Sequence, residues 1–242
     1  KNIFSLLDKN LIGAFFTTDR INRYNLKTFF IKESDKIIVE KKLLYQEMNN
    51  LIIPQVLSHK PLKSFYIEGI NLEVEYRRLA LLNDFENFFK LFKNQIDFMQ
   101  RNSIRKINKE NIALSLIKPE YIDCIPSNLI INEENFQLID IEWEVKCSVT
   151  FGALIMRSVD IMSQWFKNRD MLSWKNLIEF VNSAGIKIDK TTIDEYQALL
   201  TEIVQQVYNI KTEETANMNN ENNQILESLT STINELKSER LK

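Results

Sequence analysis

The segment of residues 121–143 constrains the fold most, because it has the pattern of two short strands with polar side chains at both ends. Its sequence is YIDCIPSNLIINEENFQLIDIEW. Residues 129–131 are an apolar run typical of a strand, and the polar residues 132–135 are of the kind that joins antiparallel strands. Residues 136–141 then run back beside the first strand. We therefore predict a hairpin in which the end of the second strand lies near the loop that precedes the first strand.

Three polar side chains are expected to converge at the open end of this hairpin. Asp123 and Asn128 lie in a short loop before the first strand, with Pro126 between them, and Asp140 lies near the end of the second strand. Carboxylate and amide oxygens are the hard ligands that suit Mg²⁺. Such a set also leaves one carboxylate free to take a proton from a hydroxyl. The residues therefore predict a metal-assisted site.

Each half of the segment also has an ordinary structural explanation. Asp, Pro, Ser and Asn all favour turns for local reasons, so residues 123–128 could form a turn without a catalytic role. Residues 140–143, Asp-Ile-Glu-Trp, could be a strand end with a buried tryptophan. The two halves together, at the separation that a hairpin provides, favour the catalytic interpretation.

The spacing resembles that of protein kinases, whose catalytic loop reads Asp, four residues, Asn, and is followed after a hairpin by a metal-binding Asp. Asp123 and Asn128 have this spacing, and Tyr121 stands where protein kinases usually carry His. Residues 139–142, Ile-Asp-Ile-Glu, are more similar to the aminoglycoside and choline kinase branch. The whole segment most resembles the kinase-like domains found beside methyltransferases and glycosyltransferases in bacterial O-antigen and surface-polysaccharide assembly, including the bifunctional chain terminators.

The resemblance implies an α+β, bilobal fold, with a small antiparallel sheet in the N-lobe and a mainly helical C-lobe. It implies an ATP- and Mg²⁺-dependent phosphotransferase that acts on a hydroxyl of a sugar or polysaccharide end. In such an enzyme Asp123 is the catalytic base, and Asn128 and Asp140 hold Mg²⁺. Lys41, on the third predicted strand, holds the ATP phosphates, although a register shift of one residue would exchange it with Lys42.

The chain departs from protein kinases at the loop that covers ATP. It has four glycines and no Gly-x-Gly, so the segment 17–24, with Arg20 and Arg23, would have to contact phosphate differently. Both arginines could equally be solvated turn residues. The departure leaves open a non-catalytic kinase-like scaffold that assembles a fused or partner methyltransferase or glycosyltransferase. Protein phosphorylation has less support, since no activation-segment pattern follows Asp140.

Hydrophobic periodicity predicts the other elements. We expect strands at 14–18, 26–31 and 36–41, a second hairpin at 65–76, and helices at 43–50, 83–100, 153–166, 172–183 and 192–208. Glu47 is a candidate partner of Lys41, and Arg157 is expected to pair with a carboxylate of the helical lobe. The predicted domains are an N-lobe over 1–82, a C-lobe with the catalytic hairpin over 83–210, and a linker with a helix over 211–242.

The last segment carries a short heptad pattern. Leu226, Leu229, Ile233 and Leu236 follow a 3-4-3 spacing. The pattern predicts either a coiled coil that joins copies of the chain into a homo-oligomer or a helix that packs on its own domain. The bifunctional chain terminators, which the chain resembles, also continue from a kinase-like domain into a coiled coil.

Composition limits the remaining classes. The 31 basic and 33 acidic residues give a net charge of −2, which offers no support for a nucleic acid partner. His59 is the only histidine, which excludes a multi-histidine metal site and a Ser-His-Asp triad elsewhere in the chain. We expect His59 to be exposed. Two cysteines and no signal peptide favour the cytoplasm or its inner-membrane surface, and no apolar run is long enough to span a bilayer. Since residue 1 is Lys, we expect the chain to belong to a longer protein.

Overall fold

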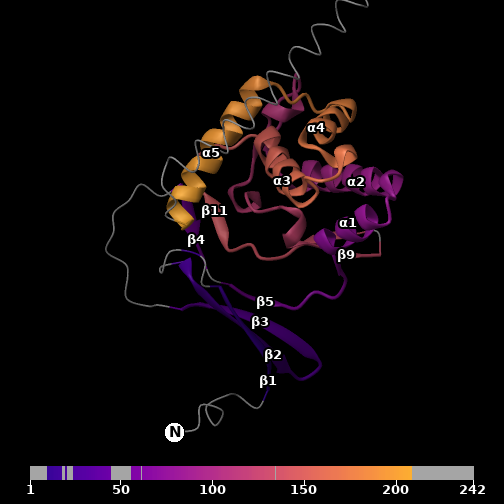
Figure 1. Cartoon of the computed structure of the whole chain (residues 1–242). Coiled ribbons are helices and arrows are strands. Elements are labelled where there is room, and N and C mark those ends of the chain that lie inside the picture. Colours follow the sequence, from indigo (N-terminus) through magenta and orange to yellow (C-terminus); the bar gives the residue numbers. More distant parts are fainter. Residues whose placement is uncertain are drawn as a thin grey trace, which may run out of the picture. The chain divides into compact units, whose positions relative to one another are not determined.

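The computed structural model describes residues 10–17, 20, 24–44, 56–60, 62–133 and 135–208. These residues are α+β, with a small antiparallel sheet in the N-terminal part and helices in the C-terminal part, as predicted (Figure 1). Internal contacts divide the chain into two compact units. Unit 1 is Lys1–Val74, Pro119–Cys147 and Gln206–Asn209, and unit 2 is Glu75–Lys118, Ser148–Gln205 and Ile210–Lys242.

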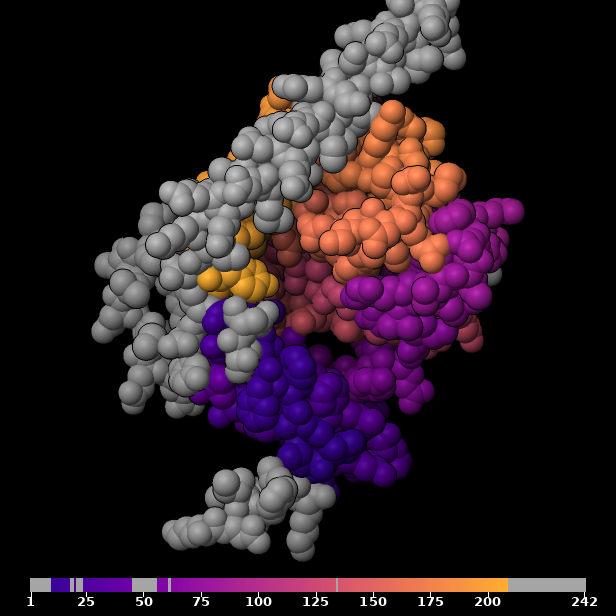
Figure 2. All heavy atoms as spheres, in the orientation of Figure 1, coloured from indigo at the N-terminus to yellow at the C-terminus, as the bar shows by residue number. Residues whose placement is uncertain are grey.

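The four-stranded sheet belongs to unit 1 and has the order β1-β2-β3-β5 with every pair antiparallel. Its strands are β1 (Leu11–Thr17), β2 (Leu26–Glu33), β3 (Lys36–Leu43) and β5 (Lys63–Phe65). Ser34, with a φ of 56°, helps the chain reverse tightly between β2 and β3. The atoms of these strands form a continuous indigo to violet surface in Figure 2. The first three strands confirm the predicted ones.

The hairpin predicted at 129–141 is confirmed as β9 (Leu129–Asn132) and β10 (Asn135–Leu138). The strands extend farther than expected, so two residues connect them instead of four, and Glu133 has the left-handed φ of 56° that tight hairpin turns favour. β6 (Ile70–Asn71) pairs with the other edge of β9. A second pair in unit 1 joins β4 (Leu57–His59) to β11 (Trp143–Val145).

The hairpin predicted at 65–76 is wrong. β5 ends at Phe65 and pairs with β3, and α1 (Leu72–Leu81) occupies the place of the second strand. Its buried residues, Leu72, Tyr76, Leu79 and Ala80, have helical spacing, whereas the first five residues of the segment alternate as a strand does. The Asn71 side chain also accepts a hydrogen bond from the backbone N–H of Glu73 at 3.0 Å, which favours a helix start.

The longer helices are close to the predicted ranges. They are α2 (Phe85–Ser103), α3 (Phe151–Trp165), α4 (Trp174–Ser183) and α5 (Lys190–Tyr208). Asp84, Thr150 and Ser173 cap the first three, since each side chain accepts a backbone N–H of the first turn. The remaining elements are β7 (Ile104–Lys106), β8 (Leu116–Ile117), η3 (Ile112–Leu114), η4 (Pro119–Tyr121), η5 (Pro126–Asn128) and η6 (Asp170–Leu172).

Unit 2 has a core of apolar side chains with a few paired polar groups. The aromatic stripe of α2 is buried there, as Phe88 and Phe92 have no exposed surface. The buried carboxylate of Asp160 accepts a hydrogen bond from the Tyr196 hydroxyl at 2.8 Å. Burial raises the pKa of Asp160, and the hydrogen bonds from Tyr196 and Gln164 and the charge of Arg157 act in the opposite direction. The ion pair expected for Arg157 stays a prediction.

None of the described helices has both the length and the apolar character needed to cross a membrane. The predicted linker and coiled coil at 211–242 lie outside the described residues, and so does most of the helix predicted at 43–50. The predicted boundary between residues 82 and 83 stays a prediction. In the observed division, the segment 119–147 groups with the N-terminal sheet.

Candidate functional site

Unit 1 contains a cavity of about 510 Å³. One wall comes from the four-stranded sheet and the other from the residues at the end of the β9–β10 hairpin. The apolar lining includes Leu26, Val39, Leu62, Ile130, Leu138 and Ile139, and the charged lining consists of Arg20, Lys41, Asp140 and Glu142. The cavity is therefore apolar over most of its surface, with its charges drawn from the sheet, from the β1–β2 connection and from residues 140–142.

Lys41 extends from β3 to the end of the hairpin. Its Nζ contacts Asp140 Oδ1 and lies 2.9 Å from Glu142 Oε2. Val39, two residues earlier, lines the same cavity, because alternate residues of a strand share a face. Lys42 points elsewhere and pairs with Glu40 at 2.8 Å. The register of β3 thus places Lys41, and not Lys42, beside the hairpin.

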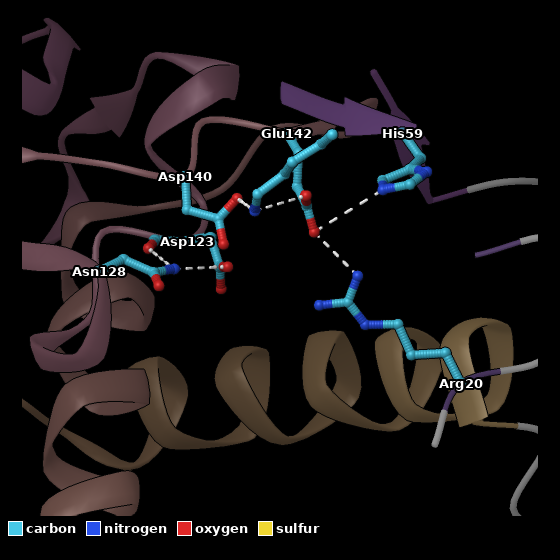
Figure 3. A network of polar contacts seen from close by, with 7 residues as sticks. Arg20, His59, Asp123, Asn128, Asp140 and Glu142 are labelled. Carbon is cyan, nitrogen blue, oxygen red and sulfur yellow. Dashed lines mark hydrogen bonds and ion pairs between the residues drawn. The ribbon is translucent and has the colours of Figure 1, made fainter. Parts of the chain in front are cut away.

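The loop of Asp123 and Asn128 is held by its own side chains. Asn128 Nδ2 donates to Asp123 Oδ2 at 2.8 Å and to the Asp123 carbonyl at 3.0 Å (Figure 3). Asn71 Nδ2 donates to the Ser127 carbonyl at 2.7 Å, which ties the loop to β6. Because the Asn128 amide nitrogen is used within the loop, its oxygen is the atom left to bind a cation.

Asp140 follows directly from this loop through the backbone. The N–H of Ile139 donates to the Asn128 carbonyl at 2.8 Å, and Asp140 itself has a left-handed φ of 62°, which Asp tolerates better than most residues. Burial, together with the negative charge of Glu142, raises the pKa of Asp140 to about 6, although Lys41 acts in the opposite direction. The positive charge of Lys41 therefore does not fully offset the effects of burial and of Glu142 on the ionised form of Asp140.

Glu142 is the centre of the charge network, and its role was left open by the sequence. Its side chain is 1% exposed, and Arg20 Nη1 donates to Oε1 at 2.8 Å while Lys41 holds the other oxygen (Figure 3). Burial by itself would raise the pKa of Glu142, but the nearby His59, Lys41 and Arg20 hold it well below the usual range. Glu142 is thus a buried, ionised carboxylate whose oxygens are already occupied by cations.

The side chain of His59 is buried, so the prediction that it is exposed is wrong. Its side chain is 4% exposed, with Nε2 3.7 Å from Glu142 Oε1. The ring centroid lies 4.3 Å from that of Trp143 and 5.6 Å from that of Tyr24. The polar neighbours of His59 in sequence indicated a surface loop, whereas its burial depends on the pairing of β4 with β11, opposite Trp143. No local pattern could reveal that pairing.

Arg20 is the second residue whose place in the site could not be predicted from the sequence. Its side chain is 17% exposed, its guanidinium carbon lies 5.3 Å from the Trp143 ring centroid, and it lines the cavity. Burial would lower the pKa of Arg20, but the hydrogen bond and charge of Glu142 outweigh it and raise that pKa. Arg23 and Glu47, two other candidates named from the sequence, lie outside the described residues.

The described residues fit Mg²⁺ as a partly hydrated ion. They contain no group of three or more His, Cys, Asp or Glu side chains that could enclose a metal. Mg²⁺ however keeps several waters and is usually bound by one or two protein ligands together with substrate phosphates. The Asn128 amide oxygen and the Asp140 oxygen not contacted by Lys41 are such ligands, and the raised pKa of Asp140 means that a cation there would be stabilised.

Comparisons of the chain with protein-family models, with curated proteins and with solved structures give no significant match. The functional interpretation therefore rests on the residues and contacts described above.

Proposed function

We propose that the chain is an ATP- and Mg²⁺-dependent phosphotransferase of the kinase-like type, which acts on a hydroxyl of a sugar or polysaccharide end. The observation that carries the proposal is the contact of Lys41 with Asp140, 99 residues apart in sequence. Asp140 is in turn linked through Ile139 to Asn128 of the Asp123 loop. A kinase-like mechanism needs these four side chains around one nucleotide.

The proposed roles follow from the groups each residue offers. Asp123, oriented by the amide of Asn128, takes the proton of the acceptor hydroxyl as the hydroxyl oxygen attacks the γ-phosphorus of ATP. The bond from the γ-phosphorus to the bridging oxygen breaks, and ADP leaves with that oxygen. Lys41 donates to the phosphates and keeps its alignment through Glu142. Mg²⁺ held by Asn128 and Asp140 would neutralise charge on the phosphates. The apolar part of the cavity suits a nucleobase, since small-molecule sites combine apolar walls with a few polar groups.

The proposal extends to the wider architecture. Two lobes would be formed by residues 1–82 and 83–210, and a C-terminal helix at 211–242 would join copies of the chain. The acceptor class, a sugar or a polysaccharide end, and an associated methyltransferase or glycosyltransferase rest on the resemblance of the segment 121–143 alone.

The first experiment is a thermal-shift titration of the chain with ATP, with and without Mg²⁺. Because a ligand that binds only the folded state raises the melting temperature, we expect a rise of at least about 3 °C at millimolar ATP, and only when Mg²⁺ is present. Asp123→Asn should keep this shift and abolish phosphate transfer to a sugar acceptor. Absence of a shift in the unmodified chain, or transfer by Asp123→Asn at the wild-type rate, would contradict the proposal.

A non-catalytic scaffold is the second candidate. The observation that favours it is that Lys41 is already paired with Asp140 and Glu142, in a chain that has no Gly-x-Gly to cover a nucleotide. A scaffold of this kind would show no ATP-dependent thermal shift and would still assemble with a methyltransferase or glycosyltransferase.

A further inference from the structure

The β1–β2 connection lacks the feature that normally binds phosphate at this place in a kinase-like sheet. β1 ends at Thr17 and β2 begins at Leu26, and no glycine occurs between them. Glycine-rich loops bind phosphate because their backbone can approach it closely and present N–H groups. A connection without glycine needs side-chain donors instead, and the described donor that it sends into the cavity is Arg20.

Arg20 is fixed on two sides by adjacent residues. Its Nη1 donates to Glu142 Oε1 at 2.8 Å, and its guanidinium carbon lies 5.3 Å from the ring centroid of Trp143. Both supports are buried, since Glu142 and Trp143 are 1% and 5% exposed. Among the described residues, Glu142 is the only hydrogen-bond partner of Arg20, so most of its five N–H donors remain for a ligand.

The arrangement of charges favours an anion in front of Arg20. Lys41 and Arg20 each contact one oxygen of the Glu142 carboxylate, so a single negative charge is shared by two positive charges. Asp140 offsets the second positive charge through Lys41 only as long as Asp140 binds no metal. Once Asp140 is committed to Mg²⁺, the pair of cations carries one excess positive charge beside the metal.

The shape of the donor suits phosphate. A guanidinium is a planar fork that binds phosphate through two parallel N–H bonds, whereas an ammonium acts as a point charge. In Figure 3 a dashed line joins one terminal nitrogen of the guanidinium to Glu142, and none is drawn from the other terminal nitrogen. The carboxylate contact therefore orients the fork and still leaves one of its edges open.

We propose that Arg20 is a second phosphate-binding cation of this site, and that its side chain, docked on Glu142 and Trp143, replaces the backbone contacts of a glycine-rich loop. This inference rests on the proposed function, because it assigns Arg20 to the phosphates of ATP. It implies that the affinity contributed by Arg20 depends on the phosphates of the ligand and not on the nucleoside.

The test compares dissociation constants of Mg·ATP, Mg·ADP and adenosine by calorimetry, in the whole chain. We expect Arg20→Gln to weaken Mg·ATP binding by about 10- to 100-fold, the effect of losing charge-assisted hydrogen bonds, and to leave adenosine binding unchanged. Arg20→Lys keeps the charge beside Glu142 and should fold like the wild type, yet recover only part of the loss. Arg105→Gln, at an exposed arginine of unit 2, is the control and should change neither constant.

Two outcomes would overturn this inference and spare the proposed function. In the first, the wild type binds Mg·ATP and both Arg20 variants bind it equally well. In the second, the variants lose ATP and adenosine in the same proportion, which would make Arg20 a structural residue. A wild-type chain that binds neither ligand would overturn the inference together with the proposed function. If Arg20→Gln does not fold, the ratio of ATP to adenosine affinity in Arg20→Lys decides, and an unchanged ratio contradicts the inference.

Discussion

Glu142 determines how the charges of the site are held, because a buried carboxylate is stable only with cations close to it. Removing water from an ion is unfavourable by several kcal/mol, and only well-placed partners offset this loss. Arg20 and Lys41 take one oxygen each, and the His59 ring covers the same side chain. Glu142 therefore acts as an anchor for two cations, which leaves Asp140 as the carboxylate that we propose binds Mg²⁺.

Replacing Glu142 with Gln should destabilise the protein, because Arg20 and Lys41 would lose their shared anion inside a largely buried site. We expect a loss of about 2–3 kcal/mol in the free energy of unfolding, measured by urea denaturation. Glu144→Gln is the matched control two residues away. Glu144 pairs with the exposed Lys60, so its loss should change stability by less than about 0.5 kcal/mol. Equal effects of the two substitutions would show that Glu142 is not the anchor.

Asp140 should make stability depend on pH in the absence of metal. Its pKa is about 6 in the folded protein and near the ordinary value of 3.8 when unfolded. Between these values the folded state holds more protons, so stability falls as pH rises, and the loss is complete above pH 6. Glu142 stays ionised throughout this range, because its pKa is lowered.

Asp140→Asn should remove this pH dependence. Compared with the wild type, we expect the variant to be more stable at pH 7, by on the order of 2 kcal/mol after solvent screening, and similar at pH 4. Urea unfolding in EDTA at the two pH values measures the difference. The same variant should lose Mg·ATP binding. A stability difference that is equal at both pH values would contradict the assignment of Asp140 as the titrating group.

At the scale of elements, Gly69 sets how closely β6 approaches the β9–β10 hairpin. Its φ is 146°, and a Cβ there would lie 2.4 Å from the carbonyl oxygen of Ile131 in β9. Neither the backbone conformation nor the space accepts another residue. The close approach lets Asn71 in β6 bond the Ser127 carbonyl and so hold the loop of Asp123 and Asn128.

Gly69→Ala should therefore destabilise the protein and disturb the site together. We expect a loss of about 2 kcal/mol or more in thermal or urea unfolding, and weaker Mg·ATP binding at a temperature where the variant is folded. Gly13→Ala is the control, since a Cβ at Gly13 meets no atom within 4 Å. If Gly69→Ala unfolds like Gly13→Ala, β6 does not hold the loop.

The elements that could be predicted are those specified by neighbours in sequence. The hairpin of β9 and β10 is local, since a polar connection stands between two apolar runs. The α2 helix is predicted by an aromatic stripe along its length and by Asp84 at its start. The start of α1 could not be predicted in this way, because five alternating residues outweighed a helical pattern that becomes visible only over its full length.

The site could be predicted in part for the same reason. The spacing of Asp123, Asn128 and Asp140 is a motif within one segment, and the motif pointed in turn to Lys41. Arg20 and His59 have no such motif. Their positions depend on the pairing of β4 with β11 and on the burial of Glu142, which are long-range properties of the fold. Polar residues in polar surroundings of sequence are predicted to be exposed, and these two are the exceptions.

For the whole molecule, the α+β class followed from the succession of short strands and long helices in the sequence, and the structure has it. The division into two units could not be read from the sequence, because each unit is assembled from separate stretches of chain. Residues 119–147 join the N-terminal sheet by contacts such as that of Lys41 with Asp140, and no local pattern marks such a return.

The long separation of the paired charges has a consequence for the order in which a newly made chain folds. Arg20 and Lys41 leave the ribosome 122 and 101 residues before Glu142, their shared partner. Until Glu142 is made, both cations stay hydrated. No ion is then buried without a partner, so no desolvation penalty arises. Glu142 is synthesised after both of its counterions. Synthesis from the N-terminus therefore never requires this carboxylate to be buried without a cationic partner.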